Sequence, residues 1–420
     1  MRQLRSIRPD ASGERRRRVL AIVGDTQVGL WVIRSLARNG LRAYAIVGSP
    51  QGQAAYSRYA AGAWTLDSAP RDAGFAEELE SLARRLDVGS IMTISETYHD
   101  VLIGIRERFE PEIHIFSPPR ERFDKATDKD YMQSLCRELD VPVAHGTTLD
   151  RLMAGAEELA FPLVLRTRRQ NDPSGRRAPW KAAYAESPEQ LSGLHESVRD
   201  LADNVLVQEY HPGVEEHVQV LMHEGRAFMT GDYIGEHHMP LAGGVTVQRV
   251  SCNHPPVIRD AVRLLAALGW QGVAGVQFHY DPATGEYIFL EINPRFIGGL
   301  PTVILAGFEA PFLLWQSHFE PERMVPGRYE VGLRSRILGG DANWMFGMMR
   351  GDQLPPGQRR LGKLATIGRF LWHSGPWTRD DTFLLGDPKP FLADLRQMVH
   401  KLGAETFDII GNPKTQETAP

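Results

Sequence analysis

The stretch that decides the fold reads Gly275-Val276-Gln277-Phe278 and then, six residues later, Gly285-Glu286-Tyr287-Ile288-Phe289-Leu290-Glu291-Ile292-Asn293-Pro294-Arg295. It is typical of two strands joined by a turn over residues 281–285. Side chains alternate between the two faces of a strand, so Glu291 and Asn293 project from the same side. If the strands pair about this turn, Gln277 on the neighbouring strand faces them. One carboxylate and two amide oxygens are the hard ligands that Mg²⁺ takes when phosphates also hold it.

A cation and an apolar run flank these polar residues. Arg295 follows immediately, and a guanidinium group at that position can hold a phosphate or a carboxylate through two parallel hydrogen bonds. Glu291 ends the apolar run that begins at Tyr287. Burying a charge there is costly unless a cation or another partner compensates. A surface hairpin whose Glu and Asn only cap a turn is the alternative.

This hairpin closely resembles the metal-binding hairpin of the ATP-grasp ligases. The wording "VQF … LEINPR" is most similar to carbamoyl phosphate synthetase, which also has Gln at the first position. The resemblance implies a metal site at Gln277, Glu291 and Asn293, with Arg295 as a catalytic residue. It also implies ATP and Mg²⁺ as cofactors, with two metal ions and with Mn²⁺ as an alternative metal.

Composition sets broad limits. A chain of 420 residues favours about three domains, and contents of 42% hydrophobic and 24% charged residues are ordinary for a soluble globular protein. The net charge of −4 gives no indication of a nucleic-acid partner. Cys136 and Cys252 lie far apart, without metal-type spacing, which favours a reduced, cytoplasmic protein. No stretch approaches the roughly 20 apolar residues of a membrane span.

The expected fold is α/β and α+β, with an N-terminal parallel α/β domain followed by a two-lobed ATP-grasp fold. Residues 1–18 include seven arginines, and residues 1–17 are expected to be a disordered basic tail. The loop Gly24 to Gly29 fits neither a phosphate loop nor the dinucleotide fingerprint, so tight strand-to-helix packing is expected there. The other expected boundaries are 18–120 for the α/β domain, 121–204 for the first ATP-grasp lobe, 205–328 for the second lobe with the metal site, and 329–420 for a C-terminal extension.

Three cations match phosphate-binding positions of the family. Lys129 matches a short element at the start of the first lobe. Arg166 ends the strand Leu163–Arg166, where most relatives carry Lys and carbamoyl phosphate synthetase carries Arg. Lys181, followed by Ala182, suits the branch that contains D-aspartate ligase, and it is expected to act in phosphate binding and in catalysis. The tail from Trp377 to Phe391 also resembles members of that branch.

The hinge between the lobes is the second specific match, and it reads Val205-Leu206-Val207-Gln208-Glu209-Tyr210-His211-Pro212-Gly213-Val214-Glu215-Glu216. The resemblance implies that Glu209 or Gln208 contacts the adenine amino group and that the main chain of His211, after Tyr210, takes the ring edge. A carboxylate after the glycine would bind the ribose hydroxyls, and Glu215 and Glu216 are both candidates. Acceptors for the diol and one donor–acceptor edge in an apolar slot suit a nucleoside.

The pair His237-His238 has no Cys or carboxylate at the usual zinc spacing. In related ligases the region around a double glycine, here Gly243-Gly244, lies near the acceptor substrate. This region either contacts the acceptor substrate or is an ordinary loop, and both alternatives stay open.

The resemblance implies an ATP-dependent carboxylate–amine ligase with two small-molecule substrates and an acyl phosphate intermediate. The sequence does not decide the oligomeric state, and a homodimer is one alternative. Enzymes that form carboxyphosphate or carbamoyl phosphate are the alternative on the same scaffold, although the chain shows one ATP-grasp unit and no glutaminase region. A non-catalytic nucleotide-binding module is a third option, and the intact run from Glu291 to Arg295 argues against it. A dehydrogenase is excluded because its glycine fingerprint is missing.

Overall fold

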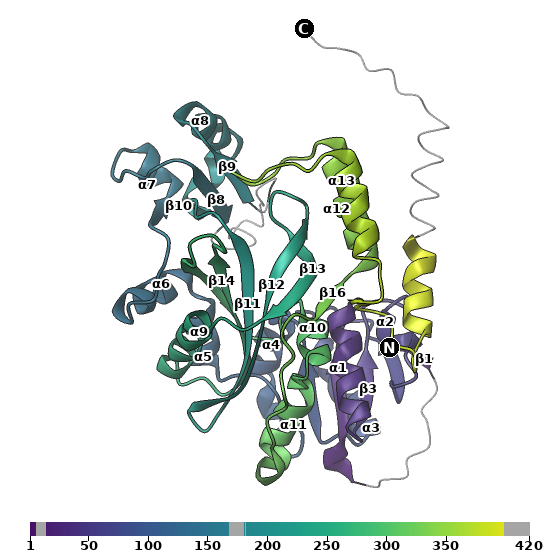
Figure 1. Ribbon diagram of the computed structural model, residues 1–420. Helices are drawn as coiled ribbons and strands as arrows, with labels where there is room; N and C mark the ends of the chain where they lie inside the picture. The colour runs from purple at the N-terminus through teal and green to yellow at the C-terminus, as the bar shows by residue number, and fades with distance from the viewer. Residues whose placement is uncertain (6–13, 168–179, 181, 399–420) are drawn as a thin grey trace.

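The computed structural model describes residues 1–5, 14–167, 180 and 182–398 (Figure 1). Three sheets organise this part of the chain: a six-stranded sheet ordered β1-β4-β3-β2-β5-β6, a four-stranded sheet ordered β7-β10-β8-β9, and a seven-stranded sheet ordered β15-β14-β11-β12-β13-β16-β17. They are called the first, second and third sheets below. No described helix is both long and apolar enough to cross a bilayer.

The first sheet is the predicted parallel α/β domain. Five of its strands, β2 to β6, run in parallel and are largely buried, as expected for apolar runs covered by helices. Gly29 packs α1 tightly against the preceding strand, because an added Cβ would lie 2.3 Å from the Val23 oxygen, so the expected strand-to-helix packing is confirmed. The elements are β2 (Arg18–Ile22), α1 (Gln27–Arg38), β3 (Arg42–Ile46), α2 (Gln53–Tyr56), β4 (Gly62–Thr65), α3 (Phe75–Arg85), β5 (Ser90–Thr93), α4 (Glu96–Gly104) and β6 (His114–Ile115).

The expectation of a disordered tail over residues 1–17 is wrong for the residues that are described. β1 (Arg2–Arg5) pairs antiparallel with β4, and residues 15–17 form a 3₁₀ turn. The Met1 amino group forms ion pairs with Asp67 and Glu78. The main chain of β1 forms hydrogen bonds with the otherwise open edge of the sheet. These bonds do not depend on the basic side chains of β1. Residues 6–13 lie outside the described part.

The second sheet forms a small lobe. It consists of β7 (Gly146–Thr148), β8 (Leu163–Thr167), β9 (Ala182–Ala185) and β10 (Val205–Glu209), accompanied by α7 (Leu149–Met153) and α8 (Pro188–Ser197). β10 lies inside this sheet, between β7 and β8, so the predicted lobe boundary at residue 205 is too early. The expected start at residue 121 is also too early. The helices α5 (Arg120–Thr127) and α6 (Lys129–Glu138) share a core with β14 and β15 of the third sheet.

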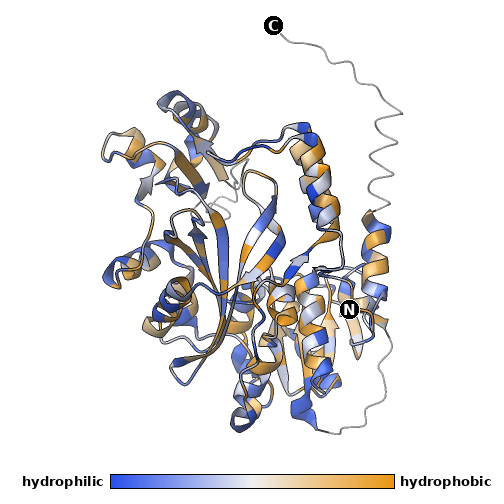
Figure 2. Ribbon diagram, viewed as in Figure 1, coloured by the Kyte–Doolittle hydropathy of each residue, from blue (hydrophilic) through white to orange (hydrophobic). Residues whose placement is uncertain are grey.

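The third sheet forms the large lobe. Its strands are β11 (Val214–His223), β12 (Arg226–Met239), β13 (Val245–Cys252), β14 (Gly272–Tyr280), β15 (Tyr287–Asn293), β16 (Arg334–Arg336) and β17 (Thr378–Asp380). One face packs on α9 (Pro255–Ala267). The other packs on α10 (Leu300–Leu305) and α11 (Ala310–Phe319), which share one core with α1. Figure 2 shows apolar residues (orange) where α1 and α10 meet.

The predicted C-terminal extension is part of this lobe. β16 and β17 belong to the third sheet, and α12 (Leu338–Arg350) and α13 (Lys363–Trp372) lie between them in the chain. A last described helix occupies residues 389–398. It returns to the N-terminal domain, where Asp394 accepts a hydrogen bond of 3.2 Å from Gln53.

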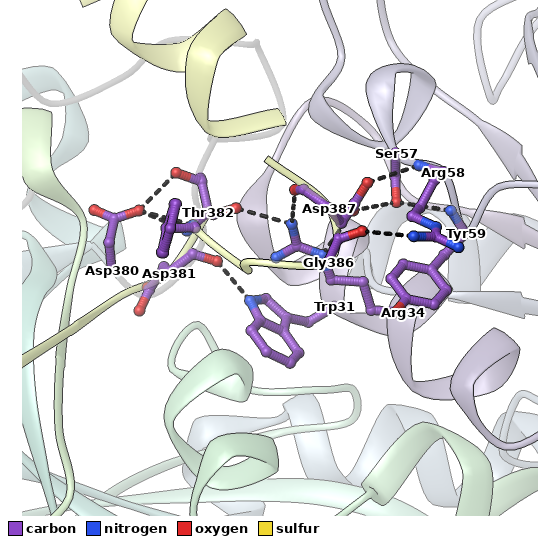
Figure 3. A network of polar contacts seen from close by, with 11 residues as sticks. Trp31, Arg34, Ser57, Arg58, Tyr59, Asp380, Asp381, Thr382, Gly386 and Asp387 are labelled. Carbon is purple, nitrogen blue, oxygen red and sulfur yellow. Dashed lines mark hydrogen bonds and ion pairs between the residues drawn. The ribbon is translucent and has the colours of Figure 1, made fainter. Parts of the chain in front are cut away.

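Residues 380–387 fasten the large lobe to the N-terminal domain (Figure 3). Asp387 accepts hydrogen bonds from Arg34 Nε at 3.0 Å, from Ser57 Oγ at 2.6 Å and from the Arg58 amide at 2.7 Å. Asp381 lies six residues before Asp387 and pairs with Arg249 Nη2 of β13 at 2.5 Å. We call residues 380–387 the clamp.

Because Arg34 is 0% exposed and Asp387 is 1% exposed, Asp387→Ala leaves a buried guanidinium group without its carboxylate. We expect the free energy of unfolding to fall by about 3–5 kcal/mol. Urea unfolding followed by the intrinsic fluorescence of the eight tryptophans measures this change. Glu196→Ala removes an exposed partner of Arg199 and should leave the midpoint unchanged. Equal midpoints for wild type and Asp387→Ala would contradict a stabilising role for the clamp.

Two stacked imidazoles make a second contact between the N-terminal domain and the large lobe. His114 of β6 and His318 of α11 lie 3.6 Å apart between ring centroids, with 9° between their planes. Burial, and then the neighbouring His318 and Arg106, lower the pKa of His114 to about 3, although Glu110 lies 3.6 Å from its Nδ1. Burial also lowers the pKa of His318. Both rings are therefore neutral when folded.

A histidine whose pKa is lower in the folded state contributes stability above pH 6.5, and this stability is lost as the pH falls towards 3, because the unfolded chain binds the proton first. We expect the free energy of unfolding to drop between pH 6.5 and pH 5, with His114 responsible for on the order of 1 kcal/mol after solvent screening. His114→Gln should flatten this dependence, measured by urea unfolding at several pH values. His145→Gln, at a 58% exposed side chain, serves as the control. An unchanged slope in His114→Gln would contradict the assignment.

Candidate functional site

A cleft of about 1480 Å³ lies where the three sheets meet, and it gathers most of the predicted site residues. Side chains of the N-terminal domain, the small lobe and the large lobe all line it. The predicted residues on its walls are Lys129, Arg166, Gln208, Glu209, Tyr210, His211, Glu215, Gln277, Glu291, Asn293 and Arg295. Glu216 is not among the lining residues, and Lys181 lies outside the described residues.

The hairpin has the predicted register. β14 and β15 pair antiparallel, with Gln277 opposite Glu291 and Gly275 opposite Asn293. Asn293 Nδ2 donates to Glu291 Oε1 at 3.2 Å, and Arg295 Nη2 donates to Asn293 Oδ1 at 2.7 Å. The predicted grouping of these side chains on one face is therefore confirmed, and Arg295 orients the Asn293 amide.

Gly275 and Gln219 fix the chain just after the hairpin. A Cβ at Gly275 would lie 2.0 Å from Ile297 Cγ2, so only glycine lets that segment pass. Gln219 accepts from the Ile297 amide at 2.9 Å and donates to the Ala274 carbonyl at 2.8 Å. The hairpin residues are thus held by a buried frame.

The hairpin donors fit a hard divalent cation. Gln277 and Asn293 offer amide oxygens, and Glu291 offers the carboxylate, all of them facing the cleft. One carboxylate does not neutralise a divalent ion, so anionic oxygens of a ligand such as a triphosphate would have to complete the charge.

Glu96 is a further carboxyl group near the hairpin, which the sequence reasoning missed. It begins α4 and lines the cleft. Burial raises its pKa, the Arg295 charge opposes this shift, and the Glu291 charge adds to it. Its position just beyond the carboxyl end of β5 could have identified it, because ligands of parallel α/β sheets bind at that edge.

Two of the predicted phosphate-binding cations lie at the joint between the lobes. Lys129 is the first residue of α6, whose N-cap Asp128 accepts from the amides of residues 130 and 131. Its Nζ donates to the Thr167 carbonyl at 3.1 Å, and Arg166 is the residue before Thr167. The Arg166 charge also opposes the burial-driven rise in the pKa of Tyr210, which reaches about 12. Both cations therefore line the same cleft as the hairpin carboxylate.

The hinge presents main-chain groups and aromatic rings to the cleft. Glu209 Oε1 accepts from the Ala160 amide at 2.9 Å, so its carboxylate is tied to the small lobe. Gln208, on the opposite face of β10, is 8% exposed and lines the cleft. The His211 carbonyl accepts from His279 Nδ1 at 2.7 Å, which leaves the His211 amide as the main-chain donor for a ring edge. Tyr210 packs edge-on against Tyr184, with 5.4 Å between ring centroids.

Glu215 and Glu216 point to opposite faces of β11, which corrects the expectation that both were candidates. Glu215 lines the cleft. Its Oε2 lies 3.4 Å from His217 Nε2, 3.5 Å from His238 Nε2 and 3.3 Å from Thr246 Oγ1. Burial would raise its pKa, but the hydrogen bonds of His217 and His238 hold the pKa well below its usual range. Glu215 is therefore an ionised acceptor in the cleft.

Glu216 faces the α9 side of the sheet and is 0% exposed. Burial and then the neighbouring Asp232 raise its pKa to about 9. The pKa of Asp232 is raised to about 6, mainly by burial. Strict alternation along β11 puts Glu216 out of reach of any ligand in the cleft.

The far end of the cleft is built by the third sheet and the C-terminal segment. His238, Gly243 and Gly244 line it. His237 is buried behind the wall, and its Nδ1 donates to Asp341 Oδ1 at 2.6 Å. Trp344 stacks on His237 and reaches the cleft. Glu236 is held by both Nε and Nη2 of Arg334 at 2.7 Å. Sequence reasoning missed Glu236 and Trp344 because the lining combines residues about 100 positions apart.

Comparisons with known proteins match the same region. The family described as "ATP-grasp in the biosynthetic pathway with Ter operon" matches residues 202–335, which include the hinge and the hairpin. The N-terminal section of the carbamoyl phosphate synthase large chain of Methanopyrus kandleri is 24% identical over 206 residues, covering 46% of this chain and 35% of the relative. The chain thus spans about a third of the length of that curated relative.

Two solved structures share the fold. The biotin carboxylase domain dimer of Hydrogenobacter thermophilus 2-oxoglutarate carboxylase, in complex with MgADP, ADP and bicarbonate, is 16% identical, with a TM-score of 0.57 over 74% of this chain and 72% of that chain. The L-amino acid ligase from Bacillus licheniformis is 15% identical, with a TM-score of 0.50 over 71% of this chain and 74% of that chain.

Proposed function

We propose that this chain, whose residues 202–335 match an ATP-grasp family model, is an ATP- and Mg²⁺-dependent carboxylate–amine ligase. The observation that carries the proposal is the composition of the cleft. The hairpin donors Gln277, Glu291 and Asn293 face the same space as Lys129 and Arg166. Phosphoryl transfer requires this combination, because catalysis consists mainly of positioning and of spreading negative charge.

The nucleotide occupies the space between the lobes in this proposal. Gln208 and the His211 amide meet the adenine edge, and Glu215 accepts from the ribose hydroxyls, since it is ionised and already oriented by His217 and His238. Lys129 and Arg166 then contact the phosphates. The proposed role of Lys181 adds a further cation at the phosphates.

The reaction proceeds in two displacements. A substrate carboxylate oxygen attacks the γ-phosphorus of ATP, and the bond to the β-phosphate oxygen breaks, giving an acyl phosphate and ADP. An amine then attacks the acyl carbon, phosphate leaves, and the amine loses a proton, which yields the amide. Bound Mg²⁺, held by Glu291, Gln277 and Asn293, supplies charge neutralisation for the phosphates. Arg295 stabilises the transferring phosphoryl group or the substrate carboxylate bidentately.

The acceptor side lies at the far end of the cleft. The double glycine at 243–244, Trp344 and the bidentate Glu236–Arg334 pair line or border this end. The Trp344 ring at this end can hold a cationic amine through a cation–π contact. This supports an amino acid or a related amine as the second substrate.

Formation of carboxyphosphate from bicarbonate is the second candidate function. The similarity to carbamoyl phosphate synthase and to a carboxylase domain solved with bicarbonate favours it. Both candidates use the same nucleotide site and differ only in the carboxylate that receives the phosphoryl group. A nucleotide-binding module without catalysis would bind ATP but release no ADP.

The deciding experiment measures ADP release with ATP and Mg²⁺ against amino acids and small carboxylic acids, singly and in pairs, and against bicarbonate. We expect a specific acid–amine pair to stimulate release and to give a condensed product by mass spectrometry. Glu291→Ala should lower turnover by about 100-fold or more, because transition-state charge loses its metal partner. Glu286→Ala, at an exposed position in the same hairpin, is the matched control and should keep full turnover. Full turnover in Glu291→Ala would refute the metal assignment.

The assignment of Glu215 predicts a specific loss of ribose recognition. Glu215→Ala should weaken ATP binding about 10- to 100-fold, since a charge-assisted hydrogen bond contributes roughly 1.5–3 kcal/mol. Calorimetric titration with ATP and with 2′-deoxy-ATP separates this loss from general damage. Wild type should prefer ATP, whereas Glu215→Ala should bind both nucleotides equally. A retained preference for ATP in the variant would show that another residue reads the 2′-hydroxyl.

A further inference from the structure

Four side chains with metal-ligating atoms meet on the α9 side of the third sheet, opposite the cleft. They are Glu216 of β11, Asp232 of β12, Cys252 at the end of β13, and His254, the N-cap residue of α9. Asp232 pairs directly with Cys252 and with Val218, and Glu216 lies two residues before Val218 on the same face. We call these four residues the sheet cluster.

The distances in the sheet cluster suit a single ion. The candidate ligand atoms all lie within 4.8 Å of one another. Cys252 Sγ lies 3.3 Å from Asp232 Oδ2, and His254 Nδ1 lies 2.9 Å from Glu216 Oε2. Tetrahedral Zn²⁺, with bonds of about 2.0–2.3 Å, separates its ligand atoms by roughly 3.2–3.8 Å. Small side-chain adjustments therefore bring all four atoms onto one centre.

The carboxyl groups of Glu216 and Asp232 are buried, so a cation has to compensate their charge if both are ionised. Glu216, Asp232 and Cys252 are 0%, 1% and 7% exposed. The second carboxylate oxygen of Glu216, Oε1, is buried and has no hydrogen-bond partner. Across the described ranges, neither Glu216 nor Asp232 forms an ion pair with a lysine or an arginine. An unpartnered acceptor at full burial costs free energy that a metal ion would recover.

We propose that the sheet cluster binds one zinc ion as a structural site. A thiolate and an imidazole select zinc over magnesium, whereas the hairpin in the cleft offers oxygen donors alone. Four protein ligands close the coordination sphere, which is the arrangement of structural rather than catalytic zinc. On binding, Cys252 gives up its thiol proton and the Glu216–Asp232 pair gives up the proton that it shares, so protons are released to solvent.

The site would connect three strands to the start of α9. β11 carries Glu216 towards the zinc site and Glu215 towards the cleft, so the ion would also fix the strand that supplies the proposed ribose ligand. His254 provides the route for the ion, because its side chain is 28% exposed while its ring stacks on Tyr280 at 4.4 Å. The zinc proposal stands on the sheet cluster itself and is independent of the proposed ligase activity.

The test is metal analysis of the purified full-length chain after incubation with Zn²⁺ and dialysis into a magnesium buffer. We expect one zinc ion per chain in wild type, and loss of that ion in Cys252→Ser and in His254→Gln. Cys136→Ser, at the other buried cysteine, is the matched control and should keep the ion. Glu291→Ala should also keep it, which separates the sheet cluster from the hairpin.

Substitution with Co²⁺ gives a second readout. A thiolate–cobalt charge-transfer band should appear in wild type and in Cys136→Ser and be absent in Cys252→Ser. Zinc should raise the melting temperature only of those proteins in which this band forms. Zinc retained in both Cys252→Ser and His254→Gln would overturn the proposal. So would a wild type that binds neither Zn²⁺ nor Co²⁺, in which case the two carboxyl groups share a proton instead.

Discussion

The antiparallel register within the third sheet is the constraint on which the rest of the molecule depends. Gln277 lies opposite Glu291, and β11 continues the same register beside β14. A slip of one residue in β15 would turn Glu291 towards α9 and bring Ile292 into the cleft. The same alternation separates Glu215 from Glu216, so one strand serves two chemically different faces. Packing against α9 makes such a slip costly, because Phe289 and Ile292 of β15 are buried in the core on that side.

Local alternation is also what made the cleft predictable. The hairpin and the hinge are short continuous stretches, so their side chains could be assigned to faces from the sequence. The resemblance then supplied roles for residues such as Lys129 and Arg166, and these residues do line the cleft. The sequence did not assign Glu216 to a face of the sheet. The start of β11 decides which of its residues point to the cleft, and it could not be located to within one residue. The branch within the ATP-grasp ligases remains a prediction.

Other features depend on contacts between distant residues. β10 looks the same in sequence whether it opens the large lobe or lies inside the small one, and only its pairing with β7 and β8 decides. The sheet cluster joins residues from three strands, so no cysteine or histidine spacing could reveal it. The tail at 380–387 resembled known relatives, but its contacts to Arg34 and Arg249 span several hundred and more than a hundred positions. Such pairings arise from the tertiary fold and have no local pattern.

The clamp also has a consequence for the order in which the chain is made. Arg34 and its carboxylate partner Asp387 are 353 positions apart. At translation rates of about 5–20 residues per second, Asp387 is synthesised roughly 20–70 s after Arg34. During that interval the N-terminal domain carries a guanidinium group without its buried partner and an uncovered α1. The N-terminal domain therefore reaches its final packing only after Asp387 has been synthesised, although it emerges before both lobes.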